Sequence, residues 1–262
     1  MAEPVKIEKA GEIVQLILNR PEAYNALNLD MAESLAAITL RLARDDSVAA
    51  LVITGAGKAF FAGGDLKWMA GFEKGPAAAL HELAGRLHLA VLEIRRMRKP
   101  VIAAINGVAA GAGFSFALAC DFRVMAQSAT LKQAYTSVGL CVNGGGTFIL
   151  PRLVGLARAL EIIAFDPVMS SEQALEWGLV TRVVKDDRVV EEAMEMARRL
   201  AKNSLHSFGW CKQLLTDSFD SSFEAHLERE RRGISNCAAH PDGREGIKAF
   251  LEKRQPVYRR NG

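Results

Sequence analysis

The sequence lacks a strong charge of either sign and lacks any pattern of paired cysteines. Its 33 Lys and Arg residues against 30 Asp and Glu residues leave a formal charge of +3, too small to favour nucleic acid or an acidic membrane surface as a partner. The four cysteines, Cys120, Cys141, Cys211 and Cys237, are far apart and form no CxxC pair. Neither a zinc site nor a disulfide framework is therefore expected, and no metal site is predicted. Unpaired, reduced thiols favour a cytoplasmic location.

The beginning of the sequence also lacks the features of a secretory signal, because MAEPVK is not a basic segment followed by an apolar run. Export is not expected. One uncharged stretch, residues 101–120, approaches the length that crosses a bilayer. Three glycines and Asn106 interrupt it, so a strand, a glycine turn and a buried helix explain it better than a lipid-facing helix. No membrane partner is expected.

What the chain does contain is an alternation of strand and helix patterns. Residues 13–19, 48–54 and 101–105 are apolar and rich in branched residues, which predicts strands. Met31, Leu35, Ile38 and Leu42 recur at helical spacing, and longer helical patterns cover residues 76–99 and 112–119. This alternation predicts an α/β architecture.

The C-terminal part of the sequence shows helical patterns only, over residues 189–202, 204–216, 221–236 and 243–253. No Gly/Ser linker separates it from the preceding part. We therefore predict a core over residues 1–198 and a helical region over residues 199–262 that packs on the core or on a neighbouring subunit.

Two glycine-rich turns are the segments best suited to chemistry. FFAGGDL (residues 60–66) and NGVAAGAGF (residues 106–114) each follow a predicted buried strand and lead into a predicted helix. Glycine allows the backbone to approach a ligand, and N–H groups at a helix start carry a partial positive charge. Two such turns facing each other can donate two hydrogen bonds to one oxygen, as an oxyanion hole does. The alternative is that both are simply tight turns. Neither matches a nucleotide-phosphate motif.

Several motifs in order along the chain resemble those of the enoyl-CoA hydratase/isomerase (crotonase) superfamily. They are NRPEAYNAL at residues 19–27, AGGDL at 62–66, KPVIAAING at 99–107, ACD at 119–121, GGG at 144–146, PRL at 151–153, residues 174–180, and EGIKAFLEK at 245–253. The resemblance runs nearly end to end. It implies a crotonase-like spiral of ββα units and a C-terminal helical region used in trimerisation, so a homotrimer or a hexamer is expected.

The resemblance further implies an acyl-CoA thioester as the partner, with coenzyme A entering as part of the substrate and no separate cofactor. By position, the two N–H groups that would hold the thioester carbonyl belong to Gly64 and Ala112. Ala112 stands where the family usually has glycine. Every residue except proline supplies a backbone N–H, so the donor is retained.

The chain departs from the family at the acids that handle protons. The two glutamates of the hydratases correspond here to Ser115 and Tyr135, and the aspartate of several isomerases and aryl-CoA dehalogenases corresponds to Asn143. Serine and asparagine cannot exchange a proton near pH 7, and tyrosine, with an ordinary pKa of about 10, is a poor base. Ordinary hydratase chemistry is therefore not favoured. Decarboxylation of a malonyl-type thioester and non-catalytic binding or scaffolding remain open.

Other candidate groups have plainer explanations beside the functional one. Cys141 is a candidate nucleophile, although cysteines in apolar runs are usually inert. His81, His88, Glu82 and Glu73 are candidates for reaching the pocket, although such residues more often lie on a helix surface. The substrate-binding positions implied by the resemblance, or adjacent to the first glycine turn, are Glu22, Ala23, Tyr24, Ala26, Ala62, Asp65, Leu66, Trp68, Phe250 and Lys253.

Overall fold

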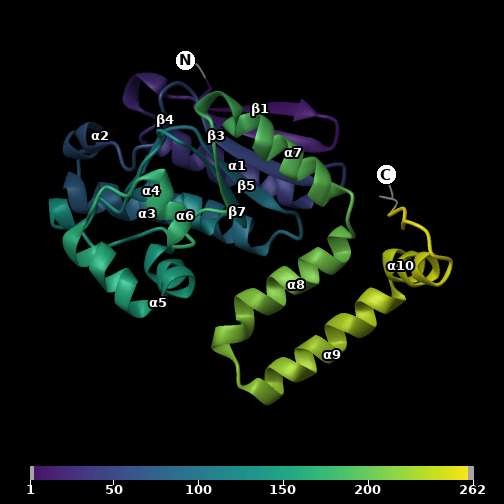
Figure 1. Ribbon diagram of the computed structural model, residues 1–262. Helices are drawn as coiled ribbons and strands as arrows, with labels where there is room; N and C mark the ends of the chain where they lie inside the picture. The colour runs from purple at the N-terminus through teal and green to yellow at the C-terminus, as the bar shows by residue number, and fades with distance from the viewer. Residues whose placement is uncertain (1–2, 259–262) are drawn as a thin grey trace.

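The computed structural model describes residues 3–258 and contains two β-sheets with helices packed around them (Figure 1). The larger sheet has the strand order β1-β2-β3-β5-β7-β9. These strands are β1 (Val5–Ala10), β2 (Ile13–Leu18), β3 (Ala50–Gly55), β5 (Val101–Ile105), β7 (Phe122–Ala126) and β9 (Arg182–Val184). Only the first pair is antiparallel. The strands β3 and β5 are buried at every position, because parallel strands are covered on both faces.

A smaller parallel sheet joins three short strands, each of which follows a strand of the larger sheet. These strands are β4 (Ala59–Phe61), β6 (Val108–Ala110) and β8 (Leu131–Lys132). Helices α2 (Leu66–Ala70) and α3 (Gly75–Arg96) follow β4, α4 (Ala112–Ala119) follows β6, and α5 (Gly146–Phe165) follows β8. The chain thus repeats a strand–strand–helix unit three times. The successive glycine turns lie between the short strand and the helix of each unit.

The remaining core helices cover the larger sheet. Helix α1 (Leu29–Arg44) is capped by the Asn28 side chain, which accepts a hydrogen bond from the Met31 N–H, and it buries Met31, Leu35 and Leu42. Helix α7 (Val189–Ala201) packs against β3, β5 and β7. It spans residue 198, the predicted boundary between the core and the helical region. The remaining elements are helix α6 (Ser171–Glu176) and four 3-10 turns: η1 (Pro21–Ala23), η2 (Thr136–Val138), η3 (Asp186–Arg188) and η4 (Ser218–Asp220).

The C-terminal helices form an arm that extends away from the sheets, drawn in green to yellow in Figure 1. We use the word arm for α8 (Leu205–Asp217), α9 (Phe223–Ala239) and α10 (Pro241–Leu251). The helices predicted over residues 204–216, 221–236 and 243–253 are thereby confirmed within one residue or two at most ends. No helix within residues 3–258 is both long enough and apolar enough to cross a membrane. The uncharged stretch 101–120 is instead β5, β6 and α4.

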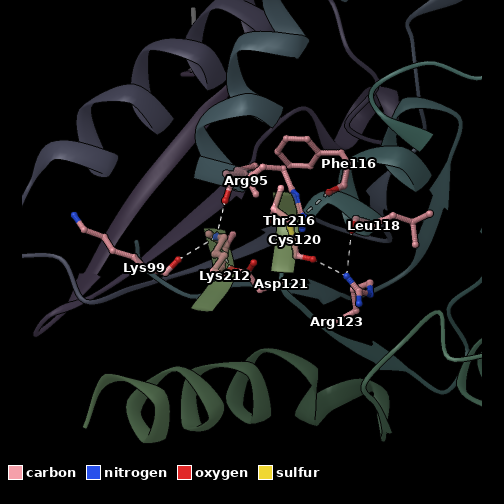
Figure 2. Close-up of polar contacts among 11 residues, drawn as sticks. Arg95, Lys99, Phe116, Leu118, Cys120, Asp121, Arg123, Lys212 and Thr216 are labelled. Carbon is pink, nitrogen blue, oxygen red and sulfur yellow. Dashed lines mark hydrogen bonds and ion pairs between the residues drawn. The ribbon is translucent and has the colours of Figure 1, made fainter. Parts of the chain in front are cut away.

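A buried ion pair ties the arm to the core (Figure 2). Lys212 of α8 lies 2.7 Å from the Asp121 carboxylate and donates to the carbonyl oxygens of Ile94 and Lys99. Asp121 also accepts a hydrogen bond from the Val101 N–H. Burial raises the pKa of Asp121 and lowers that of Lys212, while each partner's charge opposes that change. The ion pair holds α8 against the segment between α4 and β7, and the bond to Ile94 holds it against the end of α3.

Next to this pair, a buried arginine donates hydrogen bonds to backbone carbonyl groups at the end of α4. The Arg123 guanidinium donates to the carbonyl oxygens of Leu118 and Cys120 (Figure 2). It also donates to the carbonyl oxygen of Leu179. The Cys120 thiol is fully buried, and its burial raises the pKa to about 12. A cation at the C-terminal end of α4 complements the helix dipole. The opposite end of the same helix is the second glycine turn.

Candidate functional site

The two glycine turns predicted from the sequence lie against each other. Gly63 has φ +96°, a conformation that favours glycine, and a Cβ there would lie 3.0 Å from the Ala110 carbonyl oxygen and 3.5 Å from the Ala112 nitrogen. A Cβ on the adjacent Gly64 would lie 2.2 Å from the terminal carbon of Met69, so the flexible end of that side chain would have to move. Glycine at position 63 therefore allows the first turn to lie against the start of α4.

Both predicted oxyanion donors border one cavity of about 260 Å³. Ala112 is the first residue of α4, where backbone N–H groups have no partner within the helix. Neither the Gly64 N–H nor the Ala112 N–H donates a hydrogen bond to another described residue. Two unpaired N–H groups on facing turns can hold a negatively charged or polarised oxygen.

The rest of the cavity wall is mostly aliphatic. Leucine and methionine residues of α2, of α3 and of the loop before α1 line the cavity, together with residues between Ala134 and Asn143. The aliphatic lining residues are Leu27, Leu66, Met69, Leu80, Leu83, Ala84, Leu87, Val138 and Leu140. No aspartate, glutamate or lysine is among the described residues that line it.

Of the three residues that the sequence analysis matched to family acids, Tyr135 and Asn143 line the cavity and Ser115 does not. Ser115 is fully buried in α4, behind Gly144 and Gly146; a Cβ on Gly146 would lie 2.6 Å from its hydroxyl oxygen. Its hydroxyl lies 3.5 Å from that of Tyr135, which donates to the Asn143 carbonyl oxygen at 3.4 Å. Burial raises the pKa of Tyr135 further. The phenol is therefore a hydrogen-bond donor and not a base.

The Asn143 side chain is held by two neighbours. Its Oδ1 lies 2.6 Å from the Gly144 backbone nitrogen and 2.6 Å from His88 Nε2 on α3. His88 is exposed and was among the candidates with a plainer explanation. His88 follows the cavity-lining Ala84 by one helical turn, which places both residues on the same side of α3, but nothing in the sequence marks Asn143 as its partner.

Asp65 is fixed in a structural role at the edge of the cavity. It caps α2 by accepting a hydrogen bond from the Trp68 N–H, and its carboxylate pairs with Arg20 at 3.0 Å. Burial alone raises the pKa of Asp65, but the bonds from Trp68 and Arg20 outweigh it and hold the pKa below its usual value. Arg20 also donates to the Ala26 carbonyl oxygen, so it joins the loop around η1 to the first glycine turn.

The other predicted substrate-binding residues fall into two groups. Ala62 and Leu66 line the cavity, and the loop holding Glu22, Ala23, Tyr24 and Ala26 runs beside it, since the Ala62 N–H donates to the Tyr24 carbonyl. Tyr24 is 58% exposed. Trp68 is not in the cavity wall; its ring packs on Phe72, and Met69 faces the cavity in its place.

The two C-terminal positions lie apart from this site within one chain. Phe250, on α10, and Lys253, just after it, are exposed at the end of the arm, whereas α2 and α4 lie on the other side of the core (Figure 1). Cys141 and His81 are exposed, and Glu82 pairs with Arg86 at 3.8 Å. None of these three, nor Glu73, lines the cavity. Within residues 3–258, no cluster of His, Cys, Asp and Glu is arranged to hold a metal ion.

Comparison with known proteins identifies the family. The sequence model described as enoyl-CoA hydratase/isomerase matches residues 8–261. The 1,2-epoxyphenylacetyl-CoA isomerase of Escherichia coli is 37% identical over 247 residues, 94% of each chain. Crotonyl-CoA hydratase of Syntrophomonas wolfei is 34% identical over 260 residues, 98% of each chain.

Solved structures agree with this assignment. The crystal structure of an enoyl-CoA hydratase from Polaromonas has a TM-score of 0.92 and 34% identity, and the match covers 97% of this chain and 99% of that one. An enoyl-CoA hydratase from Bacillus anthracis also has a TM-score of 0.92, with 33% identity over 98% of this chain and all of that one. The predicted α/β, crotonase-like fold is confirmed, and the chain belongs to the enoyl-CoA hydratase/isomerase family.

Proposed function

We propose that this protein binds an acyl-CoA thioester with its carbonyl oxygen between the N–H groups of Gly64 and Ala112 and stabilises an enolate that the substrate forms by losing CO₂. The observation that carries the proposal is the chemistry of the cavity wall, which combines unpaired backbone N–H groups with Tyr135 and Asn143 but no carboxylate. Such a site can stabilise negative charge and cannot remove a proton from carbon.

The names of the relatives support the substrate class and leave the reaction open. One is an isomerase of an epoxyphenylacetyl-CoA, another a hydratase of crotonyl-CoA, and a third a 4-chlorobenzoyl coenzyme A dehalogenase of Arthrobacter. Their substrates share the coenzyme A thioester. A pair of N–H donors, Gly64 and Ala112, suits that shared group, whereas the positions that the resemblance matches to the family's acids hold Ser115, Tyr135 and Asn143.

The proposed reaction needs no base from the protein. In a malonyl-type thioester, the bond between C2 and the free carboxylate carbon breaks, and CO₂ leaves. The electron pair moves to the thioester, whose oxygen becomes the enolate anion held by Gly64 and Ala112. C2 then takes a proton from water, which gives the shortened acyl-CoA. Coenzyme A enters with the substrate, and the reaction requires no further cofactor.

The test is to offer the purified protein methylmalonyl-CoA and crotonyl-CoA and to separate the products by chromatography. We expect release of CO₂ and formation of propionyl-CoA from the first, and no water addition to the second. Hydration of crotonyl-CoA at a rate typical of a hydratase would overturn the proposal, because it would require an acid and a base that this cavity wall lacks.

A second candidate, non-catalytic binding of acyl-CoA, is favoured by the same loss of acids at Ser115, Tyr135 and Asn143. It predicts saturable heat on titration with acyl-CoA and no turnover of malonyl-, enoyl- or dienoyl-type thioesters. Turnover that disappears when one N–H donor is removed excludes this candidate. Absence of any binding at millimolar thioester contradicts both.

A further inference from the structure

The orientation of the Asn143 amide is determined by its neighbours. The backbone N–H of Gly144 can only donate a hydrogen bond, so the amide atom 2.6 Å from it is the oxygen, Oδ1. A flipped amide would place an NH₂ group against that N–H. The assignment of oxygen and nitrogen therefore follows from the hydrogen-bond chemistry.

The same oxygen determines the role of His88. Because Oδ1 only accepts, His88 Nε2, 2.6 Å away, must carry the proton of this hydrogen bond. Both the neutral ring protonated at Nε2 and the doubly protonated ring satisfy that requirement. The hydrogen bond from His88 thus occupies the amide oxygen in either state of the ring.

What remains for a ligand is the amide nitrogen. Asn143 Nδ2 has no hydrogen-bond partner among the described residues, and Asn143 is part of the cavity wall shared with Gly64 and Ala112. The nearby side chains are largely aliphatic, so these N–H groups find no acceptor on the protein. A ligand oxygen in the cavity could accept the hydrogen bonds that these N–H groups donate.

We propose that Asn143 selects acyl groups that carry an oxygen acceptor beyond the thioester carbonyl, such as the C3 oxygen of a 3-oxoacyl or malonyl-type group. We assign His88 as the positioning residue that keeps the Asn143 NH₂ group directed toward that oxygen. The inference rests on the proposed binding of acyl-CoA in this cavity, and it does not depend on loss of CO₂.

The test compares two thioesters of the same chain length, acetoacetyl-CoA and butyryl-CoA, by calorimetric titration of the full chain. Only the first has an oxygen on C3, and neither can lose CO₂. We expect the wild type to bind acetoacetyl-CoA about tenfold more tightly, the gain typical of a satisfied hydrogen bond. We define the preference as the dissociation constant of butyryl-CoA divided by that of acetoacetyl-CoA. In Asn143→Leu this ratio should fall to about one. In the isosteric Asn143→Asp it should fall below one, because a carboxylate repels the oxygen.

The role of His88 is tested by the same ratio. His88→Leu removes the donor and should lower the preference about threefold, because the amide can then turn, whereas His88→Gln keeps a donor and should retain most of it. His81→Leu, an exposed change on the same helix, is the matched control and should leave the ratio at its wild-type value.

Each outcome separates the hypotheses. Binding of both thioesters without preference, or an unchanged ratio in both Asn143 variants, overturns the role of Asn143 and leaves the proposed acyl-CoA binding intact. A wild-type ratio in His88→Leu overturns the positioning role. If neither thioester binds, the proposed function fails, and this inference fails with it.

Discussion

At the scale of single residues, the chemistry of the cavity depends on its hydrogen-bond donors. Ala112 provides one of them at the first position of α4, a place where proline is well tolerated because the N–H there has no helical partner. A change at this position can therefore remove the donor and preserve the helix.

We expect Ala112→Pro to lower kcat on the thioester substrate by about 10²–10³, the usual effect of losing one oxyanion donor. The measurement is steady-state turnover, with circular dichroism to verify that α4 and its neighbours are folded. Ala112→Gly, which keeps the N–H and matches the usual family residue, should stay near the wild-type rate. A folded Ala112→Pro variant with unchanged kcat would show that this N–H is not a donor to the reacting oxygen.

At the scale of the helices and strands, the arm depends on the ion pair between Lys212 and Asp121. Lys212→Met leaves a buried carboxylate without its cation, and we expect it to lower the free energy of unfolding by about 3–5 kcal/mol. Urea unfolding followed by circular dichroism measures this loss. The double change Lys212→Met with Asp121→Leu should recover much of the stability, because neither charge is then buried alone. Equal losses in the single and double variants would contradict this account.

The joint between α8 and α10 is expected to weaken in acid. His206 of α8 stacks on His240 at 3.9 Å between ring centres. Burial, reinforced by the charges of His240 and Arg98 and opposed by Asp242, lowers the pKa of His206 below its ordinary 6.5. The unfolded chain therefore binds the proton first, so stability present above about pH 6.5 is lost as the pH falls below it.

The measurement is the thermal midpoint at pH values about one unit above and below 6.5. His206→Phe keeps an aromatic ring against His240 and removes the titrating group, so its midpoint should change less between the two conditions than that of the wild type. A wild-type pH response in this variant would assign the acid sensitivity to other groups.

The main elements could be predicted from periodicity because burial leaves a simple pattern. The strands β3 and β5 and the helices α1, α3 and α4 were all recognisable in this way. The short strands β4, β6 and β8 were not, since two or three residues carry no period of their own and pair only through the tertiary fold. The contact of His88 with Asn143 spans 55 residues of sequence, and no local pattern specifies which helix faces which loop.

The positions of the site were accessible to different degrees. The places of Gly64, Ala112, Tyr135 and Asn143 around one cavity followed from motif order, and the structure brings them together. Ser115 was expected beside them, but its side chain is enclosed by the glycines that begin α5. Short side chains do not extend from α4 into the cavity, and sequence position alone does not report side-chain reach.

At the scale of the whole molecule, the arm carries large apolar side chains that a single chain leaves exposed. Phe250 is 82% exposed, Leu251 75% and Ile234 72%. Surfaces of this kind usually mark contacts with another protein. We therefore expect the chain to form a trimer or a hexamer, with a mass three or six times 28.5 kDa by light scattering. A stable species of 28.5 kDa at micromolar concentration would contradict this expectation. The cytoplasmic location stays a prediction.

The fully buried Cys120 is a chemical probe for transient opening of the core. Cys141 and Cys211 are exposed, whereas Cys120 is buried at the C-terminal end of α4, and burial raises its pKa to about 12. Only the thiolate reacts with iodoacetamide, so the folded protein should be alkylated quickly at the two exposed sites and not at Cys120. Peptide mass spectrometry over time then counts how often the core opens. The Arg123 guanidinium donates a hydrogen bond to the carbonyl oxygen of this same cysteine. The rate at which Cys120 is labelled therefore reports how often the end of α4, the helix that begins at Ala112, opens.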